Sequence, residues 1–264
     1  MGLAPASLPE LDFAAATALA LQLDFSAPHP RHFGAPAAEM QPLRLGDFEG
    51  EVVRGASCNC SRITLVPHCN GTHTEGVGHL TVQQVPLQQY VPLSPLPALL
   101  LTVSPQVAAG CDEDTDPFPL PGDELITRAA LLRAWQPFAQ HRPPALLLRT
   151  GANIDGGNPP YLSRQFAQEL LARGVEHLVL DLPSVDRAQD EGLLTAHRIF
   201  FGLPAHSVDR AQASRPRCTI TELAQFPAHL TDGPCALQLQ LAPFSGDAVP
   251  SRPLHIPLRR REAS

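Results

Sequence analysis

The chain has 264 residues, with 26 acidic against 19 basic side chains and a formal charge of −7. This negative charge argues against general nucleic-acid binding, which depends on a basic surface. Hydrophobic residues make up 44% of the chain, so it can bury a core, and a disordered or fibrous protein is excluded.

The N-terminal segment differs from a secretion signal, because it has no cationic start and its apolar run is interrupted by Glu10 and Asp12. No window reaches the roughly 18 uninterrupted apolar residues that a membrane helix needs. Six cysteines are scattered along the chain, which favours free thiols over a disulfide scaffold. We therefore expect a cytoplasmic protein with no membrane partner.

The first half of the chain is predicted to form short strands and loops. Alternating and apolar runs predict strands over 18–25 and 62–67, with a Pro-rich stretch through Pro42 between them. The second of these strands runs into a segment rich in Gly, His and Thr. A buried strand is predicted over 98–103, followed by an acidic surface loop over 111–117.

The second half alternates strands with helices. Helical spacing is seen over 125–135 and 161–174, where Gly174 is a helix-ending signal, and the runs at 144–150 and 175–186 are typical of buried strands. Strand, helix and strand in this order predict a βαβ unit that places Asp181, Ser184 and Asp186 at a carboxyl end of the sheet. Further strands are predicted over 218–223, 235–243 and 252–259, which completes one compact α/β domain.

Residues 67–79 are denser in potential metal ligands than any other part of the chain. They contain three histidines, one cysteine and one carboxylate, namely His68, Cys69, His73, Glu75 and His79. Imidazole, thiolate and carboxylate bind zinc and its neighbours, and the three glycines in this segment allow a tight loop. The spacing matches neither a zinc finger nor HExxH. The residues favour a metal site here, and the alternative is a polar surface loop with chance histidines.

The segment GTHTEGVGH (71–79) resembles the HxGTHxDxPxH signature of the metal-dependent cyclase family, which includes bacterial kynurenine formamidases and isatin hydrolases. Five further segments resemble the family in the same order: LQLDFSAPHP (21–30), LLLRTG (146–151), LVLDLPSVD (178–186), AHRIFFG (196–202) and TITEL (219–223). The resemblance implies a single-domain α/β fold of the swivelling β/β/α type, with a mixed β-sheet core and flanking helices. We place this domain at 19–258, between an N-terminal extension (1–18) and a basic tail (259–264).

The resemblance also implies roles for individual residues. His73, Glu75, His197 and Glu222 match metal ligands of the family, and His79 matches a histidine that transfers protons. The family holds one or two ions, usually Zn²⁺ and in some members Mn²⁺.

Three positions depart from the family pattern: Cys69 replaces its first histidine, Glu75 its aspartate and Val77 its proline. A thiolate is a sound zinc ligand, so either Cys69 or the adjacent His68 can be the remaining ligand. Whether Glu75 bridges two ions also stays open. Residues expected to support or orient the site without binding the ion are His68, Thr72, Asp181, Ser184 and Asp186.

The mechanism implied is metal-assisted hydrolysis of an amide. A bound cation lowers the pKa of its water from about 15.7 toward about 7 and polarises the carbonyl, while His79 moves the proton to the leaving amine. The leading expectation is an arylformamidase of tryptophan catabolism that converts N-formyl-L-kynurenine to kynurenine and formate. The alternatives are hydrolysis of another cyclic or aryl amide or a lactone, and a catalytically silent metal-binding or ligand-binding member. The resemblance further implies a homodimer or larger assembly.

Overall fold

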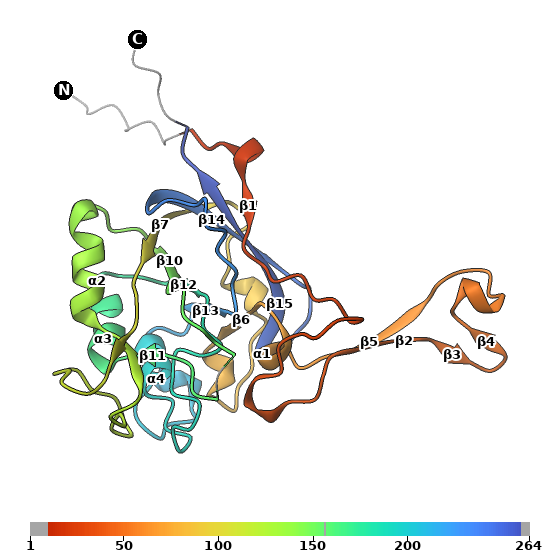
Figure 1. The fold of residues 1–264 in the computed structure, drawn as a ribbon, viewed down its shortest axis with the longest axis horizontal. Coiled ribbons are helices and arrows are strands. Elements are labelled where there is room, and N and C mark those ends of the chain that lie inside the picture. The colour runs from red at the N-terminus through yellow and green to blue at the C-terminus, as the bar shows by residue number, and fades with distance from the viewer. Residues whose placement is uncertain (1–9, 156, 260–264) are drawn as a thin grey trace, which may run out of the picture.

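The computed structural model describes residues 10–155 and 157–259 (Figure 1). Most of the expected basic tail (260–264) and the first nine residues of the expected extension lie outside these ranges. The helices are α1 (Pro67–Asn70), α2 (Arg128–Trp135), α3 (Arg164–Ala172) and α4 (Thr195–Phe201). The strands are β1 (Thr17–Ala18), β2 (Glu39–Pro42), β3 (Arg44–Leu45), β4 (Phe48–Glu49), β5 (Ser61–Thr64), β6 (His73–Gly76), β7 (Leu96–Thr102), β8 (Gln106–Val107), β9 (Glu124–Ile126), β10 (Ala145–Arg149), β11 (Tyr161–Leu162), β12 (His177–Leu180), β13 (Thr219–Glu222), β14 (Gly233–Leu241) and β15 (Ala248–Pro257).

Within the described residues, seven strands close on themselves into a barrel-like sheet. Their order is β15-β14-β7-β10-β12-β13-β6, and β6 pairs back onto β15. The four central strands β7, β10, β12 and β13 run parallel, whereas β6, β14 and β15 pair antiparallel with their neighbours. Helix α3 connects β10 to β12, so the predicted βαβ unit is confirmed.

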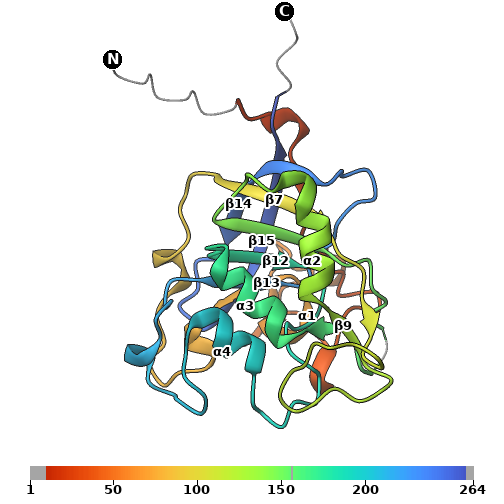
Figure 2. The same ribbon diagram turned by 90° about the vertical axis from the view of Figure 1, so that its left-hand side faces the viewer.

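The parallel strands are buried on both faces, which explains their uninterrupted apolar runs. On β7, Leu99 and Leu101 belong to the cluster that packs against the helices, while Leu100 belongs to a separate cluster. Figure 2 shows α2, α3 and α4 lying over one side of this sheet. The second cluster also takes Leu147 from β10 and Leu237 from β14, and it fills the interior of the closed sheet.

Both predicted helices begin after short strands that the helical spacing did not reveal. Thr127 caps α2 by accepting from the backbone N–H of Ala130, and Ser163 caps α3 by accepting from that of Phe166. The residues just before each cap form β9 and β11, which pair with each other. None of the described helices combines the length and the apolar character needed to cross a membrane.

The strand predicted over 18–25 is largely wrong. Only Thr17–Ala18 pairs with β15, and the chain then leaves the sheet. The reason is competition for one edge of β15, because β6 occupies that edge from Ala248 to Pro250. A strand that continued past Ala18 would collide with β6.

The strand predicted over 62–67 exists in part as β5 and lies outside the barrel-like sheet. It pairs with β2 in a two-stranded ribbon that projects away from the sheet and carries β3 and β4 near its outer end (Figure 1). We call residues 39–64 the arm. All four residues of β5 are exposed, whereas all four residues of β6, in the ligand-rich segment that follows, are buried.

Candidate metal centre

Two adjacent strands bring three potential ligands together. His73 and Glu75 are two residues apart on β6 and therefore share one face of the sheet. His73 lies directly opposite Glu222 of β13, so the Glu222 side chain is on that face too. One ligand atom from each of these three residues lies within 4.8 Å of the other two.

A fourth side chain reaches this cluster from α4. The Nε2 atom of His197 is 2.8 Å from Oε1 of Glu75 and 3.7 Å from Oε1 of Glu222. Asp186 holds the ring from behind by accepting from Nδ1 at 2.6 Å, and it also accepts from the backbone N–H groups of Ala196 and His197 at the start of α4. We call His73, Glu75, His197 and Glu222 the inner group, all of them at most 3% exposed.

Hydrogen bonds behind the two imidazole rings determine which nitrogen faces the cluster. Nδ1 of His73 is 3.0 Å from the carbonyl oxygen of Gly71, which can only accept, so Nδ1 carries the proton. Nδ1 of His197 likewise carries the proton, because the Asp186 carboxylate beside it can only accept. In both rings Nε2 is therefore the atom that faces the carboxylates and is free to take a cation.

The inner group fits a metal ion. Nε2 of His73, Nε2 of His197 and both carboxylate oxygens of Glu75 are buried without a hydrogen-bond partner among the described residues. Buried polar atoms normally have such partners, and a cation coordinated by these four atoms would satisfy them together. Nitrogen and carboxylate oxygen donors are suited to Zn²⁺, with Mn²⁺ as an alternative.

The pKa shifts of Glu75 and His197 also indicate that the inner group favours a positive charge. Burial by itself raises the pKa of Glu75, but the neighbouring His79 and His197 hold it well below its usual value. Burial lowers the pKa of His197, yet Glu75 and Asp186 raise it well above the ordinary histidine value. The carboxylates thus attract either a proton on the imidazole or a metal ion.

A second, more exposed group lies at the edge of the first. Nδ1 of His68 is 3.0 Å from Oε2 of Glu75, and its Nε2 is 2.9 Å from Oδ2 of Asp247. Nδ1 of His79 is 3.6 Å from the same Asp247 oxygen, and the two imidazole rings lie 4.2 Å apart. We call His68, His79 and Asp247 the rim group, with side chains 23%, 27% and 34% exposed.

Glu75 belongs to both arrangements. Its ligand atoms and those of His68 and His79 also lie within 4.8 Å of one another. Burial lowers the pKa of His68, but the hydrogen bond to Asp247 and the nearby Glu75 carboxylate raise it to about 10. The hydrogen bond from His68 and the nearby His79 imidazole hold the pKa of Asp247 far below its usual value.

Asp247 is the residue that sequence reasoning missed. It directly precedes β15, and the first residue of that strand, Ala248, is paired with Glu75 of β6. The backbone carbonyl of Asp247 also accepts from the N–H of Gly76. Its only sequence signal would have been the pairing of β15 with β6, which no local pattern reveals.

The contacts favour His68 over Cys69 as the side chain that reaches Glu75. Cys69 is buried on α1, and among the described residues the groups of converging ligand atoms contain His68 but not this thiol. Burial and the nearby Glu222 carboxylate both raise the pKa of Cys69, which disfavours a thiolate.

The other residues expected to support the site, Thr72, Asp181 and Ser184, form hydrogen bonds near the ends of strands. Thr72 donates to the carbonyl of Leu223 and accepts from the N–H of Leu21. Asp181 accepts from Thr150 and Gly151 at the end of β10. Ser184 accepts from the N–H of Asp186 and so shapes the turn that holds His197.

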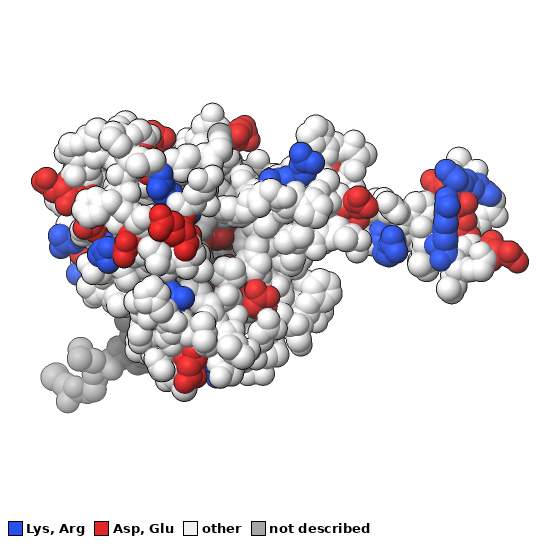
Figure 3. Space-filling view, turned by 90° about the horizontal axis from the view of Figure 1, so that it is seen from below, with Lys and Arg blue, Asp and Glu red and all other residues white. Residues whose placement is uncertain are grey.

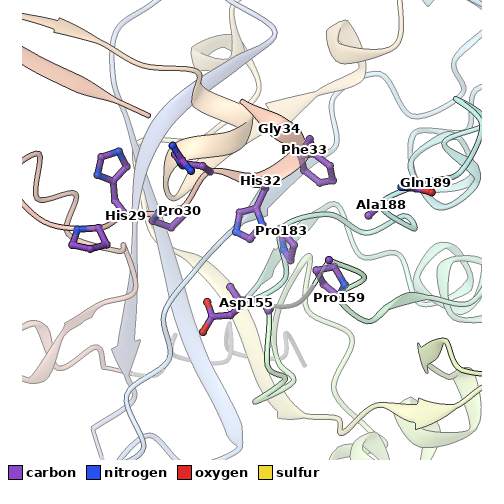
Figure 4. Close-up of a pocket in the computed structure, with 14 residues that line it drawn as sticks. His29, Pro30, His32, Phe33, Gly34, Asp155, Pro159, Pro183, Ala188 and Gln189 are labelled. Atoms are coloured by element: carbon purple, nitrogen blue, oxygen red, sulfur yellow. The ribbon is translucent and has the colours of Figure 1, made fainter. Parts of the chain in front are cut away.

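A cavity of about 850 Å³ opens beside the centre. One wall is the loop from Pro28 to Gly34, and another contains Asp155 and Pro183 (Figure 4). His32 points from the first wall into the cavity (Figure 4). Burial lowers the pKa of His32, and the charges of Asp155 and Glu222 act in the opposite direction without cancelling this effect. The cavity thus borders the region of the inner group through His32, and none of the inner-group residues lines it.

The family model described as "Putative cyclase" matches residues 17–187. This stretch is more than half of the chain and contains the ligand-rich segment 67–79 and the turn 181–186. It ends before His197 and Glu222. A comparison with curated proteins finds no match.

Solved structures share the fold over nearly the whole chain. Isatin hydrolase A from Ralstonia solanacearum is 14% identical with a TM-score of 0.60, covering 92% of this chain and 91% of that one. Isatin hydrolase A from Labrenzia aggregata is 14% identical with a TM-score of 0.59, covering 92% and 94%. A "predicted metal-dependent hydrolase" from Bacillus stearothermophilus is 16% identical with a TM-score of 0.55, covering 91% and 97%. The α/β fold expected from the sequence is thereby confirmed, and the chain belongs to the cyclase family.

Proposed function

We propose that this protein is a metal-dependent hydrolase that cleaves a carboxamide C–N bond. The observation that carries the proposal is the inner group, in which two imidazole nitrogens and the oxygens of a carboxylate converge without hydrogen-bond partners. A divalent cation held there would polarise a carbonyl group and acidify water, which is the chemistry that amide hydrolysis requires.

His79 is our candidate for proton transfer. It is part-exposed at the mouth of the centre, and its ring centroid lies 5.6 Å from that of His197. An imidazole exchanges protons near neutral pH, so it can accept one from the attacking water and return it to the leaving amine. Asp247, 3.6 Å from Nδ1 of His79, would orient the ring for both steps.

We place one zinc ion in the inner group. The second oxygen of Glu75 faces His68, so a second ion shared with the rim group is the alternative arrangement. The two arrangements differ in the role of His79. With one ion, His79 is free to transfer the proton, whereas a ring that coordinates a second ion cannot also do so. Metal content of one or two ions per chain decides between them.

For the substrate, N-formyl-L-kynurenine remains our leading candidate. The cavity has the size of a small-molecule site, for which about 300–1,000 Å³ is usual. Phe33 offers an aromatic ring on its wall and His32 a polar contact. Cyclic amides form the second candidate, because structural neighbours include isatin hydrolases.

The test combines metal content with turnover in one preparation. Elemental analysis should give zinc or manganese, and formate release from N-formyl-L-kynurenine should be measured beside ring opening of cyclic amides and lactones. His197→Ala should lose both metal and activity. His229→Ala, which replaces an exposed histidine outside both the inner and the rim group, is the matched control and should retain both.

Three outcomes would be decisive. Turnover of a cyclic amide with no formate release would replace the leading substrate by the second candidate. Metal without turnover of any amide or lactone would favour a silent binding protein. Full activity of His197→Ala would refute the role of the inner group.

A further inference from the structure

The cavity beside the metal centre has walls that are made of loops. It is visible as a hollow in the face of the body shown in Figure 3. Among the described residues that line it, none belongs to a strand or to an α-helix. Loops are the parts of a protein that open most easily, so walls of this kind need fixed points if the cavity is to keep its shape.

Asp123 provides such a fixed point. It directly precedes β9, and its side chain is 4% exposed. Its Oδ1 atom accepts from Nδ2 of Asn158 at 2.8 Å, and Oδ2 accepts from the Tyr161 hydroxyl at 2.7 Å and from the backbone N–H of Leu120 at 2.9 Å. Nε of Arg187 lies 3.0 Å from Oδ2. Four groups from separate parts of the chain therefore converge on one buried carboxylate.

Two of these contacts lead directly to the cavity. Asn158 stands between Gly157 and Pro159, which both line the cavity. Arg187 is followed by 188–189, which line it as well (Figure 4). We call residues 157–159 and 187–189 the anchored wall, because both segments are held by the same carboxylate.

The number of contacts requires a carboxylate rather than an amide. An ionised carboxylate accepts about four hydrogen bonds, whereas an amide of the same size has one oxygen, which accepts about two. Burial raises the pKa of Asp123, but its hydrogen bonds and the charge of Arg187 hold the pKa below its usual value. The side chain is therefore ionised at neutral pH, and a neutral substitute would leave buried donors without an acceptor.

We propose that Asp123 is a positioning residue, which fixes the anchored wall and thereby controls the affinity for the substrate. This inference rests on the hydrolase function proposed above. Among the described residues, Asp123 is neither one of the converging ligands nor one that lines the cavity. Its loss should therefore weaken substrate binding without slowing the chemical step. Asp186, in contrast, acts on a candidate ligand through the ring of His197.

The test compares Asp123→Asn with Asp232→Asn on an amide that the wild type cleaves. Asp232 is the matched control, because its carboxylate also accepts from a backbone N–H and a hydroxyl, both of Thr102, and pairs with Arg149. For Asp123→Asn we expect a KM at least about tenfold higher, with kcat within about twofold of the wild type. The metal content should be unchanged. The control should keep the KM of the wild type.

Trypsin provides a measurement that does not depend on turnover. Trypsin cleaves after arginine, and the Arg187 side chain beside Asp123 is 13% exposed. Asp123→Asn should raise the rate of cleavage after Arg187 by at least about tenfold, because proteolysis follows the population of the opened segment. Asp232→Asn should be cleaved there at the rate of the wild type.

If Asp123→Asn fails to fold, Asn158→Ala replaces it, since this change removes a single contact at an exposed residue. Asn158→Ala should raise KM by about threefold or more at an unchanged Tm. A wild-type KM in the folded variants would overturn the proposal, as would a loss of kcat or metal at unchanged KM.

Failure of the hydrolase function is a separate outcome. A wild type that cleaves no amide or lactone would refute that function alone, and trypsin would then decide the role of Asp123. Faster cleavage after Arg187 in Asp123→Asn would support the anchored wall, whereas cleavage at the rate of the wild type would refute it.

Discussion

The inner and rim groups share Glu75 but differ in almost every other physical respect. The inner group is buried, and the rings of His73 and His197 are each fixed from behind by a carbonyl or a carboxylate. The rim group is about one quarter to one third exposed, and its histidines contact each other and Asp247. Burial and fixed orientation favour tight ion binding, whereas partial exposure favours proton exchange with water.

If this division is correct, removing the shared carboxylate should have the largest effect. Glu75→Gln keeps the size of the side chain but removes its charge from both groups. We expect loss of bound metal and at least about a thousandfold loss of turnover. Elemental analysis and the amide assay measure both. Glu169→Gln on α3 is the control, because Glu169 pairs with two arginines rather than with the centre.

A variant of the rim group should separate proton transfer from ion binding. His79→Gln is expected to lower turnover by about a hundredfold to ten-thousandfold while the metal content stays that of the wild type. A parallel loss of metal would show that His79 is a ligand, and the distinction between the two groups would then fail.

A smaller loss of metal affinity is expected when Asp186, which orients the His197 ring, is replaced. Asp186→Asn preserves an oxygen that can cap α4 but weakens the bond to Nδ1 of His197. Metal affinity should fall by about 10-fold to 100-fold, because second-layer partners of ligating histidines contribute this much. Titration with a competing chelator measures the affinity. Asp186→Ala should in addition lower the free energy of unfolding by about 1 kcal/mol through the lost helix cap.

The smallest effect is expected at Cys69. Because its thiol lies outside the converging ligand atoms, Cys69→Ser should leave metal content unchanged. His68→Gln should lower turnover more, since His68 contacts both Glu75 and Asp247. Loss of metal from Cys69→Ser, with His68→Gln unaffected, would reverse the assignment and restore the thiol as the ligand.

Local patterns predicted the parallel half of the sheet well. Apolar runs located β7, β10 and β12, and helical spacing located α2 and α3, because a strand buried on both faces and an amphipathic helix each impose a periodicity on their own residues. The same reasoning extended β1 too far, since the edge it would have used is occupied by β6. It also could not show that β5 belongs to an exposed arm.

The sequence by itself determined the donor set in 67–79, the order of strands and helices in the second half, and, through resemblance, the family. Only the tertiary structure decided that Asp247 joins the centre, that His68 contacts Glu75, and that Asp186 accepts a hydrogen bond from His197. Ligand identity is a property of single residues, whereas convergence depends on pairing between strands that are far apart in the chain. The pairings of β6 with β13 and of β6 with β15 bring residues 73, 222 and 247 to one place, and no local periodicity encodes such contacts.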